Sequence, residues 1–447
     1  MPFKFLKKYQ KDISETFNLS LPILFGRLGA VLMGVLDNIM IGKIGYEPLA
    51  ASGIATSIYI LIAIIPIGMI IVGSPMISGF NSREDKQGAV DTLKSCIQVS
   101  QLVSFAFAIV LCVIALNFHL LGQEPIVTEL ALPLFYLLIL STFPLMYFIA
   151  VEQFTDGLGN TGISMFFNVS ALFVNAGINY CLIYGNFGFP ELGLLGAGIG
   201  TLIARTYMAI GIWCYVRYSK QFSEYALNFN QLQIHWESFK QVLKTGLPSG
   251  FQFFFEISAF SFATIAVGWL GTVQLAAHNV IISIASITYM VSSGFAAGSS
   301  IRVGYASGTH DVKAVLNAAK SGMILVCSLI LVFSIALIIF NKYFIILYNE
   351  DVEVVAIASG LMLLLAVFQF ADGINVVAVA ILRAISDVNV PALLTMGCFW
   401  ALGIPMGLLF SFYFHLDVYG IWLGLLIGQG ISSIILTWRF FHKARKM

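Results

Sequence analysis

Residues 257–301 read ISAFSFATIAVGWLGTVQLAAHNVIISIASITYMVSSGFAAGSSI, a run without a single Asp, Glu, Lys or Arg. A helix needs about 20 mostly apolar residues to cross the hydrocarbon core of a bilayer, so this run is long enough for more than one crossing. Further charge-free runs cover residues 48–82, 95–123, 130–151, 157–190, 321–341, 388–416 and 418–438. The sequence therefore predicts a chain built from membrane-spanning segments.

The composition excludes other classes of protein. Of the 447 residues, 59% are hydrophobic and 10% are charged, and the mean hydropathy is +0.92. Soluble domains carry roughly 25% charged residues, and disordered chains combine low hydrophobicity with high charge. The formal net charge of +1 gives no argument for a nucleic-acid partner.

The spanning segments are expected to be helices. Only helices and closed barrels satisfy their backbone polar groups in lipid, and the alternating pattern of an outer-membrane barrel is absent. Gly, Pro, Asn and the clusters of charge divide the chain into about twelve spans. We expect them at residues 17–42, 49–80, 88–118, 126–152, 161–185, 192–217, 241–268, 275–305, 313–342, 352–383, 389–413 and 419–441.

The distribution of Lys and Arg predicts the orientation. Nearly all of those outside the spans fall on segments on the same side as the N-terminus, and only Lys43 and Lys342 fall on the other side. Positive charge concentrates in cytoplasmic loops. We therefore expect a multi-pass protein of the plasma membrane with both termini in the cytoplasm and the basic, polar start of the chain forming an interfacial helix.

The two halves of the sequence repeat each other at a nearly constant shift. Leu21-Pro22 matches Leu247-Pro248, Leu49-Ala50-Ala51 matches Leu275-Ala276-Ala277, and a slightly different shift relates Gly196 and Gly200 to Gly420 and Gly424. We predict an N-terminal six-helix lobe (1–217), a cytoplasmic linker (218–240) and a C-terminal six-helix lobe (241–447). Two parallel repeats are typical of transporters that work by alternating access.

Catalytic and nucleotide-binding patterns are not found in the sequence. It contains no GxxxxGK[ST], HExxH or GxSxG, so we expect no ATP hydrolysis, no enzymatic activity and no cofactor. An ion gradient or a partner must then supply the energy. The expected partners are the lipid bilayer and small-molecule substrates, and we expect a monomer.

Two acidic residues fall in the middle of spans of the second lobe. Glu256 lies in FQFFFEISAF and Asp372 lies in FQFADGIN. An ionisable residue inside a span is energetically costly and points to function. Two carboxylates in one bundle suggest a bound cation or a shared proton, so this pair is a candidate Na⁺ or H⁺ site.

The first lobe holds a second set of polar residues. Asp37 lies near the outer end of the first span, Asn175 and Asn179 share one face of the fifth, and Thr201 lies in the sixth. Oxygen ligands of this kind suit a hard cation such as Na⁺, although Asn also joins helices in membranes. Arg27 and Arg205 also fall within spans, and the sequence assigns them no partner.

The chain resembles the multidrug and toxic-compound extrusion (MATE) family, in particular its bacterial NorM-type branch. The resemblance covers nearly the whole chain. It rests on the order, spacing and duplication of LDNIMIGKIGYEPLAASG (36–53), EQFTDGLGNT (152–161), VNAGINYCLIYG (174–185), GLPSGFQFFFE (246–256), VGWLGTVQLAAHNV (267–280) and FQFADGINVVAVAILRAISD (368–387).

The resemblance implies an all-α membrane protein with twelve helices in two pseudo-symmetric six-helix bundles around a central cleft. It also implies export of organic cations or drugs in exchange for Na⁺ or H⁺. The family's cation-coupling positions correspond here to Glu256 and Asp372 in the second lobe. In the first lobe they correspond to Asp37, Asn175, Asn179 and Thr201, with a carbonyl from Ala197.

Two positions depart from the family pattern. Archaeal members have an aspartate where this chain has Asn179, so the first-lobe site carries less charge; related members have a tyrosine where this chain has Phe368, so a hydroxyl ligand is lost. An alternative function is a flippase of a lipid-linked precursor in a related two-lobed superfamily. That function would be expected to place more basic residues in the cavity than Arg27 and Arg205.

Overall fold

The computed structural model describes residues 2–122, 124–225, 235–348 and 350–447, and all of the regular structure in these ranges is helical. Twelve helical segments in them are long and apolar enough to cross a membrane, which confirms the predicted all-α membrane fold. The helices of the first half are α1 (Pro2–Gly42), α2 (Tyr46–Ile70), α3 (Gly73–Asn81), α4 (Lys86–Leu116), α5 (Pro125–Gly157), α6 (Thr161–Tyr184) and α7 (Leu194–Tyr218). Those of the second half are α8 (Trp236–Gly268), α9 (Thr272–Gly308), α10 (Val312–Ile339), α11 (Asn341–Ile346), α12 (Val352–Ala384), α13 (Asn389–Met396), α14 (Ile404–Leu408) and α15 (Asp417–Ala444).

Several spans differ in detail from the sequence prediction. The helix α1 is continuous, so the expected interfacial segment and the first span form one element. The second span consists of α2 and α3, separated by a turn at Ile71 and Val72. The eleventh span combines α13 and α14 with two π-helical segments, η4 (Gly397–Gly403) and η5 (Leu409–Tyr413). Within the expected linker, η3 (Lys220–Tyr225) is 3₁₀-helical, and residues 226–234 lie outside the described residues.

Contacts divide the chain into two compact units. We call Phe25–Gly250 the N-terminal unit, and Met1–Leu24 together with Phe251–Met447 the C-terminal unit. The two division points, after Leu24 and after Gly250, are related by the same shift that relates Leu21 to Leu247 in the repeat. The first part of α1 therefore packs with the second half of the sequence, and the first part of α8 packs with the first half. The lobe boundaries at 217 and 241 remain a proposal from the sequence.

The turns and helix starts of the two halves correspond as the repeat predicts. Gly45 precedes α2 with φ +147°, and Gly271 precedes α9 with φ +141°. Only glycine adopts this backbone region without strain, because any Cβ atom would clash there. Asp85 and Asp311, which the same shift relates, cap α4 and α10 by accepting hydrogen bonds from backbone N–H groups of the first turn.

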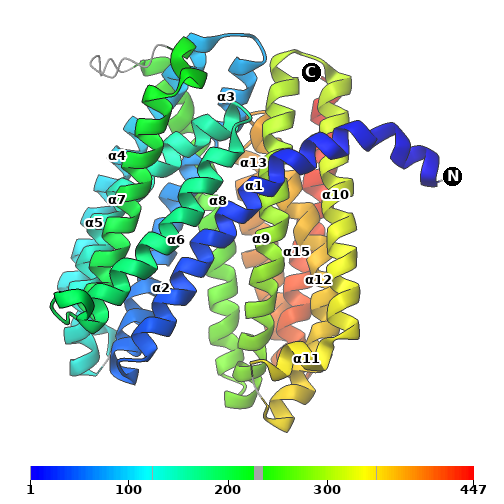
Figure 1. The fold of residues 1–447 in the computed structure, drawn as a ribbon. Coiled ribbons are helices and arrows are strands. Elements are labelled where there is room, and N and C mark those ends of the chain that lie inside the picture. Colours follow the sequence, from blue (N-terminus) through cyan, green and yellow to red (C-terminus); the bar gives the residue numbers. More distant parts are fainter. Residues whose placement is uncertain (1, 123, 226–234, 349) are drawn as a thin grey trace. The chain divides into compact units, whose positions relative to one another are not determined.

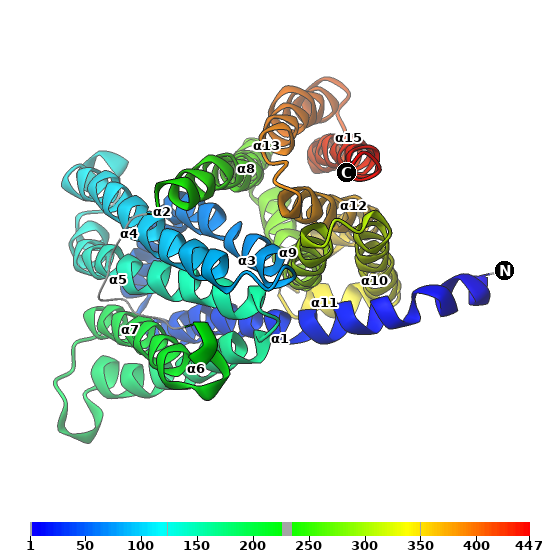
Figure 2. The same cartoon turned by 90° about the horizontal axis from the view of Figure 1, so that it is seen from above.

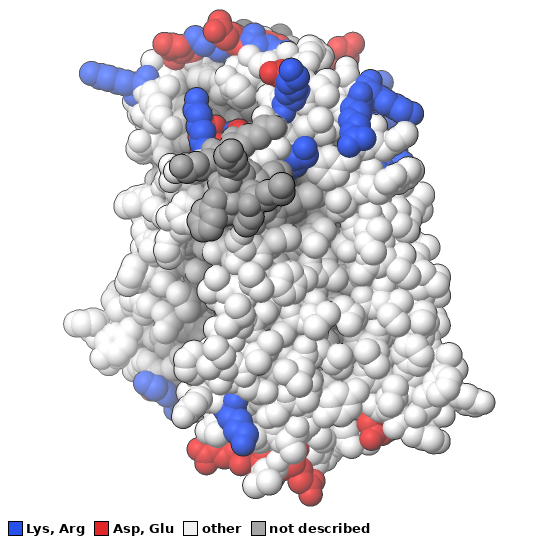
Figure 3. All heavy atoms as spheres, turned by 90° about the vertical axis from the view of Figure 1, so that its right-hand side faces the viewer, with Lys and Arg blue, Asp and Glu red and all other residues white. Residues whose placement is uncertain are grey.

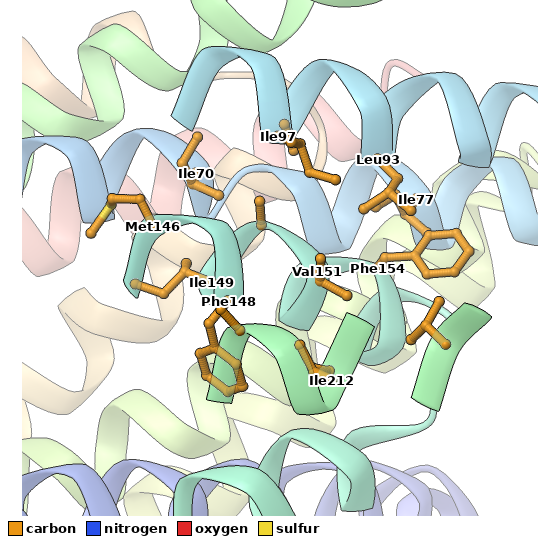
Figure 4. Close-up of a cluster of buried hydrophobic side chains, with 14 of the residues drawn as sticks. Ile70, Ile77, Leu93, Ile97, Met146, Phe148, Ile149, Val151, Phe154 and Ile212 are labelled. Atoms are coloured by element: carbon orange, nitrogen blue, oxygen red, sulfur yellow. The ribbon is translucent and has the colours of Figure 1, made fainter. Parts of the chain in front are cut away.

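The N-terminal unit is held together by tightly packed apolar side chains. Its helix α5 packs against α2, α4 and α7, and α7 also packs against α6. Figure 4 shows Ile70, Leu93, Phe148, Phe154 and Ile212 converging from four of these helices on one buried cluster. These side chains pack against one another in the interior of the unit. Because protein interiors tolerate few voids, such packing holds the helices close together.

The C-terminal unit is built around α12. Figures 1 and 2 both place α9, α10 and α12 side by side, and α15 packs against α12 from another direction. On the face that carries α10 and α12, charged side chains gather near the two ends, and the broad band between them is uncharged (Figure 3). Exposed apolar residues such as Val332 (65% exposed) and Ile339 (66%) lie on α10, as a lipid-facing surface requires.

One ionic cluster fixes the start of α1 within the C-terminal unit. The guanidinium of Arg302 on α9 donates hydrogen bonds to the Asp12 carboxylate and the Glu15 carboxylate, both at 2.7 Å. It also donates to the Thr16 hydroxyl at 2.8 Å. Further along α1, Ser20 packs directly against Gly298 of α9. A methyl group on Gly298 would collide with the serine side chain.

Candidate functional site

Glu256 and Asp372 both lie in the interior of the C-terminal unit. Glu256 on α8 is 8% exposed and Asp372 on α12 is 7% exposed. They are near enough for the charge of Asp372 to act on Glu256, and the charge of Arg383 acts on Glu256 as well. Within the described part of the chain, the Glu256 carboxylate receives no hydrogen bond. Its oxygens are therefore available to a ligand.

Asp372 is the end point of a chain of hydrogen bonds that the sequence did not reveal. The Gln429 amide nitrogen on α15 donates to Asp372 Oδ1 at 2.7 Å. The Asn375 amide nitrogen donates to Gln429 Oε1 at 3.4 Å, and the Ser432 hydroxyl donates to Asn375 Oδ1 at 2.9 Å. All four side chains are buried. The Oδ2 atom of Asp372 has no such donor among the described residues.

Other side chains shape the surroundings of this pair. Phe368 is buried, and its ring packs against Phe260 and Trp422 at centroid distances of 6.0 and 5.7 Å, where a tyrosine would have brought a hydroxyl. The Arg383 guanidinium lies over the Phe253 ring, 5.2 Å from its centroid. Gln369, one turn before Asp372, is 3% exposed, and neither of its amide atoms has a hydrogen-bond partner among the described residues.

The polar residues predicted for the first lobe meet in the N-terminal unit. The Asn179 amide nitrogen donates to Asp37 Oδ1 at 2.6 Å and to Asn175 Oδ1 at 3.3 Å. The Thr201 hydroxyl contacts Asp37 Oδ2 at 3.3 Å and donates to the Ala197 carbonyl at 3.0 Å. Both oxygens of Asp37 therefore have a partner in this chain, and the Ala197 carbonyl already accepts one hydrogen bond.

Arg205, which the sequence left unassigned, belongs to the surroundings of Asp37. It lies on α7 one turn after Thr201, and its charge acts on Asp37. Its guanidinium donates to the Tyr59 hydroxyl at 2.9 Å and to the Ser141 hydroxyl at 2.7 Å. This arginine supplies a permanent positive charge next to the single carboxylate of the group.

Arg27, also unassigned from the sequence, acts on a separate acidic pair at the end of α5. Its charge acts on both Glu152 and Asp156. The Asn168 amide donates to Glu152 at 3.0 Å, and the Ser164 hydroxyl donates to Asp156 at 2.6 Å. Each carboxylate of this pair therefore already receives a hydrogen bond from α6.

Comparison with known proteins settles the family. The model of the MatE family matches this chain twice, at residues 22–181 and at residues 248–409. The chain belongs to the MatE family. The two matches begin at Pro22 and Pro248, which are equivalent positions of the repeated Leu-Pro pair, so they coincide with the internal repeat. Membership confirms the resemblance seen in the sequence and makes the chain a multi-pass membrane transporter of this family.

Curated relatives of this MatE protein match over almost their entire length. A "Probable multidrug resistance protein NorM" of Xylella fastidiosa is 28% identical over 443 residues, which cover 99% of this chain and 94% of the relative. The protein of the same name from Rhizobium meliloti is 29% identical over 435 residues, covering 96% and 93%.

Solved structures show the same fold at lower identity. The eukaryotic MATE transporter AtDTX14 superposes with a TM-score of 0.89 at 18% identity, covering 98% of each chain. A transporter of the MOP superfamily from Pyrococcus furiosus superposes with a TM-score of 0.86 at 19% identity, covering 97% of this chain and 96% of its own. At this identity the likeness concerns the fold alone.

Proposed function

We propose that this MatE protein is a secondary active antiporter that exports organic cations or drugs in exchange for Na⁺ or H⁺ by alternating access. The names of the relatives support drug export, and the duplicated helical architecture supports alternating access. We further propose that it acts as a monomer. We place both termini in the cytoplasm, as the distribution of Lys and Arg predicts.

The coupling cation is proposed to bind at Glu256 and Asp372, and the charges of the two units carry this choice. In the C-terminal unit the positive charge of Arg383 acts on Glu256, and the side chain that donates to Asp372 is the neutral amide of Gln429. With both carboxylates ionised, the pair is therefore one positive charge short. In the N-terminal unit the single carboxylate of Asp37 is matched by Arg205. An uncompensated charge inside a membrane is costly, so the first group attracts a mobile cation more strongly than the second.

The free coordination positions support the same choice. Glu256 receives no hydrogen bond within the described residues, and Asp372 receives one, from Gln429. Asp37 has partners on both oxygens. Carboxylate oxygens are suitable ligands for Na⁺, and the same pair can share a proton. Asp37 with Asn175, Asn179, Thr201 and Ala197 is proposed as a second, weaker cation group.

Exchange requires that the cation and the substrate favour different conformations or compete for one of them. A ligand shifts a conformational equilibrium only by its difference in affinity for the two states. Entry of a cation at Glu256 and Asp372 would therefore stabilise the state that has released its substrate. The same linkage requires the bound substrate to weaken binding of the cation.

Dye uptake into everted membrane vesicles, which corresponds to export from the cell, tests the proposal. Ethidium fluorescence is followed while a Na⁺ gradient and a pH gradient are imposed separately, and the gradient that drives transport identifies the cation. Glu256→Gln and Asp372→Asn should each abolish the gradient-driven efflux at normal expression. Glu353→Gln is the matched control, because Glu353 is an exposed carboxylate on the same helix as Asp372. Full gradient-driven efflux in both test variants would refute the assignment, and absence of efflux of any cationic dye by the wild type would favour the flippase.

A further inference from the structure

The last helices of the two repeats carry different residues at one equivalent position. The shift that relates Gly196 to Gly420 and Gly200 to Gly424 also relates Arg205 on α7 to Gln429 on α15. The fold supports this correspondence. A methyl group on Gly200 would collide with Asn179 of the preceding helix α6, and one on Gly424 would collide with Gly403 and Gly407 of the preceding eleventh span.

In the N-terminal unit this position carries a permanent charge. Arg205 is anchored by the Tyr59 and Ser141 hydroxyls at 2.9 and 2.7 Å, so its guanidinium is fixed beside the group that contains Asp37. A guanidinium fixed beside the carboxylate compensates its charge at every pH, because arginine stays protonated in proteins. A mobile cation that bound at this carboxylate would then add little further compensation of its charge.

In the C-terminal unit the same position carries a neutral amide whose direction is set by its neighbours. The Ser432 hydroxyl donates to Asn375, Asn375 donates to Gln429, and Gln429 donates to Asp372. Reversing the Gln429 amide would point its oxygen at a carboxylate and its nitrogen at another N–H donor. While Asp372 is ionised, the three residues therefore form a one-way relay that presents an N–H group to Asp372 Oδ1.

We propose that position 205/429 of the repeat determines which unit takes the coupling cation, and that Gln429, oriented by Asn375 and Ser432, positions Asp372 to bind it. The relay fixes Oδ1 as a hydrogen-bond acceptor and supplies no charge, so Oδ2 and Glu256 stay available and one positive charge is still missing. This inference rests on the proposed coupling at Glu256 and Asp372. It adds three positioning residues, none of which needs to touch the substrate.

Transport by the purified full-length protein in proteoliposomes tests the relay. Ethidium transport is measured against the concentration of the driving cation, which is Na⁺ or H⁺ as the vesicle experiment determines. Gln429→Leu removes the N–H donor that orients the ionised Asp372. If Na⁺ drives transport, we expect the half-saturating concentration to rise about tenfold, because Asp372 is no longer held for binding. If H⁺ drives transport, we expect it to fall about tenfold, because losing a hydrogen bond to the ionised carboxylate favours its protonated form. The maximal rate at saturating cation should stay close to that of the wild type, because Glu256 and Asp372 are still present.

The far end of the relay provides a stricter test. Ser432→Ala removes a neutral hydrogen bond that reaches Asp372 only through two other side chains. We expect the half-saturating concentration to change about threefold, in the same direction as in Gln429→Leu. Ser432→Thr keeps the hydroxyl and should restore the wild-type value. Ser334→Ala is the control: Ser334 is also buried and donates to the Ala366 carbonyl of α12 at 3.0 Å, but it lies outside the relay.

Exchange of the repeat residues tests the charge argument. Gln429→Arg copies the residue of the first repeat, and we expect it to bind ethidium but to lose stimulation by the cation gradient, with Gln429→Lys as a second variant if the arginine prevents folding. Wild-type half-saturation in Gln429→Leu and Ser432→Ala, or unchanged gradient stimulation in Gln429→Arg or Gln429→Lys, would overturn the inference. If Glu256→Gln and Asp372→Asn leave gradient-driven efflux intact, the proposed function itself fails. If they abolish it while the relay variants behave as the wild type, only the relay fails.

Discussion

The close approach of α7 to α6 makes Gly200 a sensitive position. An ideal Cβ atom at residue 200 would fall on the Asn179 side chain, which donates to Asp37 at 2.6 Å. In Gly200→Ala the asparagine must move, and a hydrogen bond to a charged group contributes about 1.5–3 kcal/mol. Against this loss, alanine is favoured over glycine inside a helix by about 1 kcal/mol. We expect a net destabilisation of about 1 kcal/mol.

A matched glycine separates the two effects. Gly177 lies on α6, two residues before Asn179, and no heavy atom lies within 4 Å of a Cβ built on it. Gly177→Ala therefore gains the helix propensity without a collision. One kcal/mol corresponds to roughly 2–4 °C in the unfolding midpoint of a domain of this size class. We expect the apparent midpoint to rise by about 2–4 °C in Gly177→Ala and to fall by a similar amount, about 2–4 °C, in Gly200→Ala.

The assay is thermal unfolding of the purified protein in detergent at one heating rate, followed by tryptophan fluorescence. Asn179→Ala serves as the background for a double-mutant cycle, because it removes the atoms with which the new methyl group collides. On that background Gly200→Ala should raise the midpoint just as Gly177→Ala does. The reasoning would be refuted if Gly200→Ala raised the midpoint in the wild type, or lowered it equally with and without Asn179.

Three further outcomes follow from contacts away from the proposed cation site. Arg302→Gln should destabilise the protein by about 2–3 kcal/mol, since it breaks ion pairs that include Asp12 at 2.7 Å; thermal unfolding together with Asp12→Asn in a double-mutant cycle measures this. Gly271→Ala should cost about 1–3 kcal/mol, because φ +141° is strained for any residue with a side chain, and the same unfolding assay checks it. The Lys86 ammonium donates to the Glu224 carboxylate and lowers the pKa of Glu224, so Lys86→Gln should move that pKa up towards 4.5, measured by NMR titration. A carboxylate whose pKa is lower in the folded state stabilises the folded protein at a pH above its unfolded-state pKa. This stabilisation is lost as the pH falls through the folded-state pKa. The small contribution of Glu224 should be absent in Lys86→Gln.

The helical architecture could be predicted because lipid imposes it. Long runs without charge admit few structures other than spanning helices, and repeated pairs such as Gly45 and Gly271 mark equivalent turns. The family followed from the order of the motifs. The break at Ile71 and Val72 and the π-helical segments were not predicted, because a change of helical hydrogen bonding leaves the apolar composition unchanged.

The polar interior could be predicted only in part. Acidic residues are conspicuous in an apolar run, so Glu256, Asp372 and Asp37 were found as candidates, and their roles stay predictions. The amide of Gln429 drew no attention, because its partner Asp372 lies 57 residues earlier on another helix and no periodicity connects the two. A search for every Asn, Gln and Arg inside a span would have included Gln429, Asn375 and Arg205, although it could not have paired them.

The division of the chain into units shows a limit of a different kind. A boundary drawn along the sequence has to leave each lobe contiguous, as the proposed cut between 217 and 241 does. The contact units divide α1 after Leu24 and α8 after Gly250, and the lobe boundaries stay a prediction. Prolines at equivalent positions, Pro22 and Pro248, lie just before these points. Proline inside a helix removes a backbone hydrogen bond and favours a bend there, so each first helix can follow two different neighbours along its length.

Duplication and function make opposite demands on this chain. Glycine is favoured at equivalent positions in both halves, because a Cβ atom at Gly200 would collide with the Asn179 side chain and one at Gly424 with the backbone of Gly403 and Gly407. The polar residues beside those glycines face no such constraint, and they differ: Arg205 in one half and Gln429 in the other. Because a fixed arginine and a mobile cation are alternative ways to neutralise a buried carboxylate, a transporter with two equivalent units needs this difference if only one of them is to respond to the ion gradient. The asymmetry of charge, rather than that of the fold, is therefore what gives the proposed coupling its location.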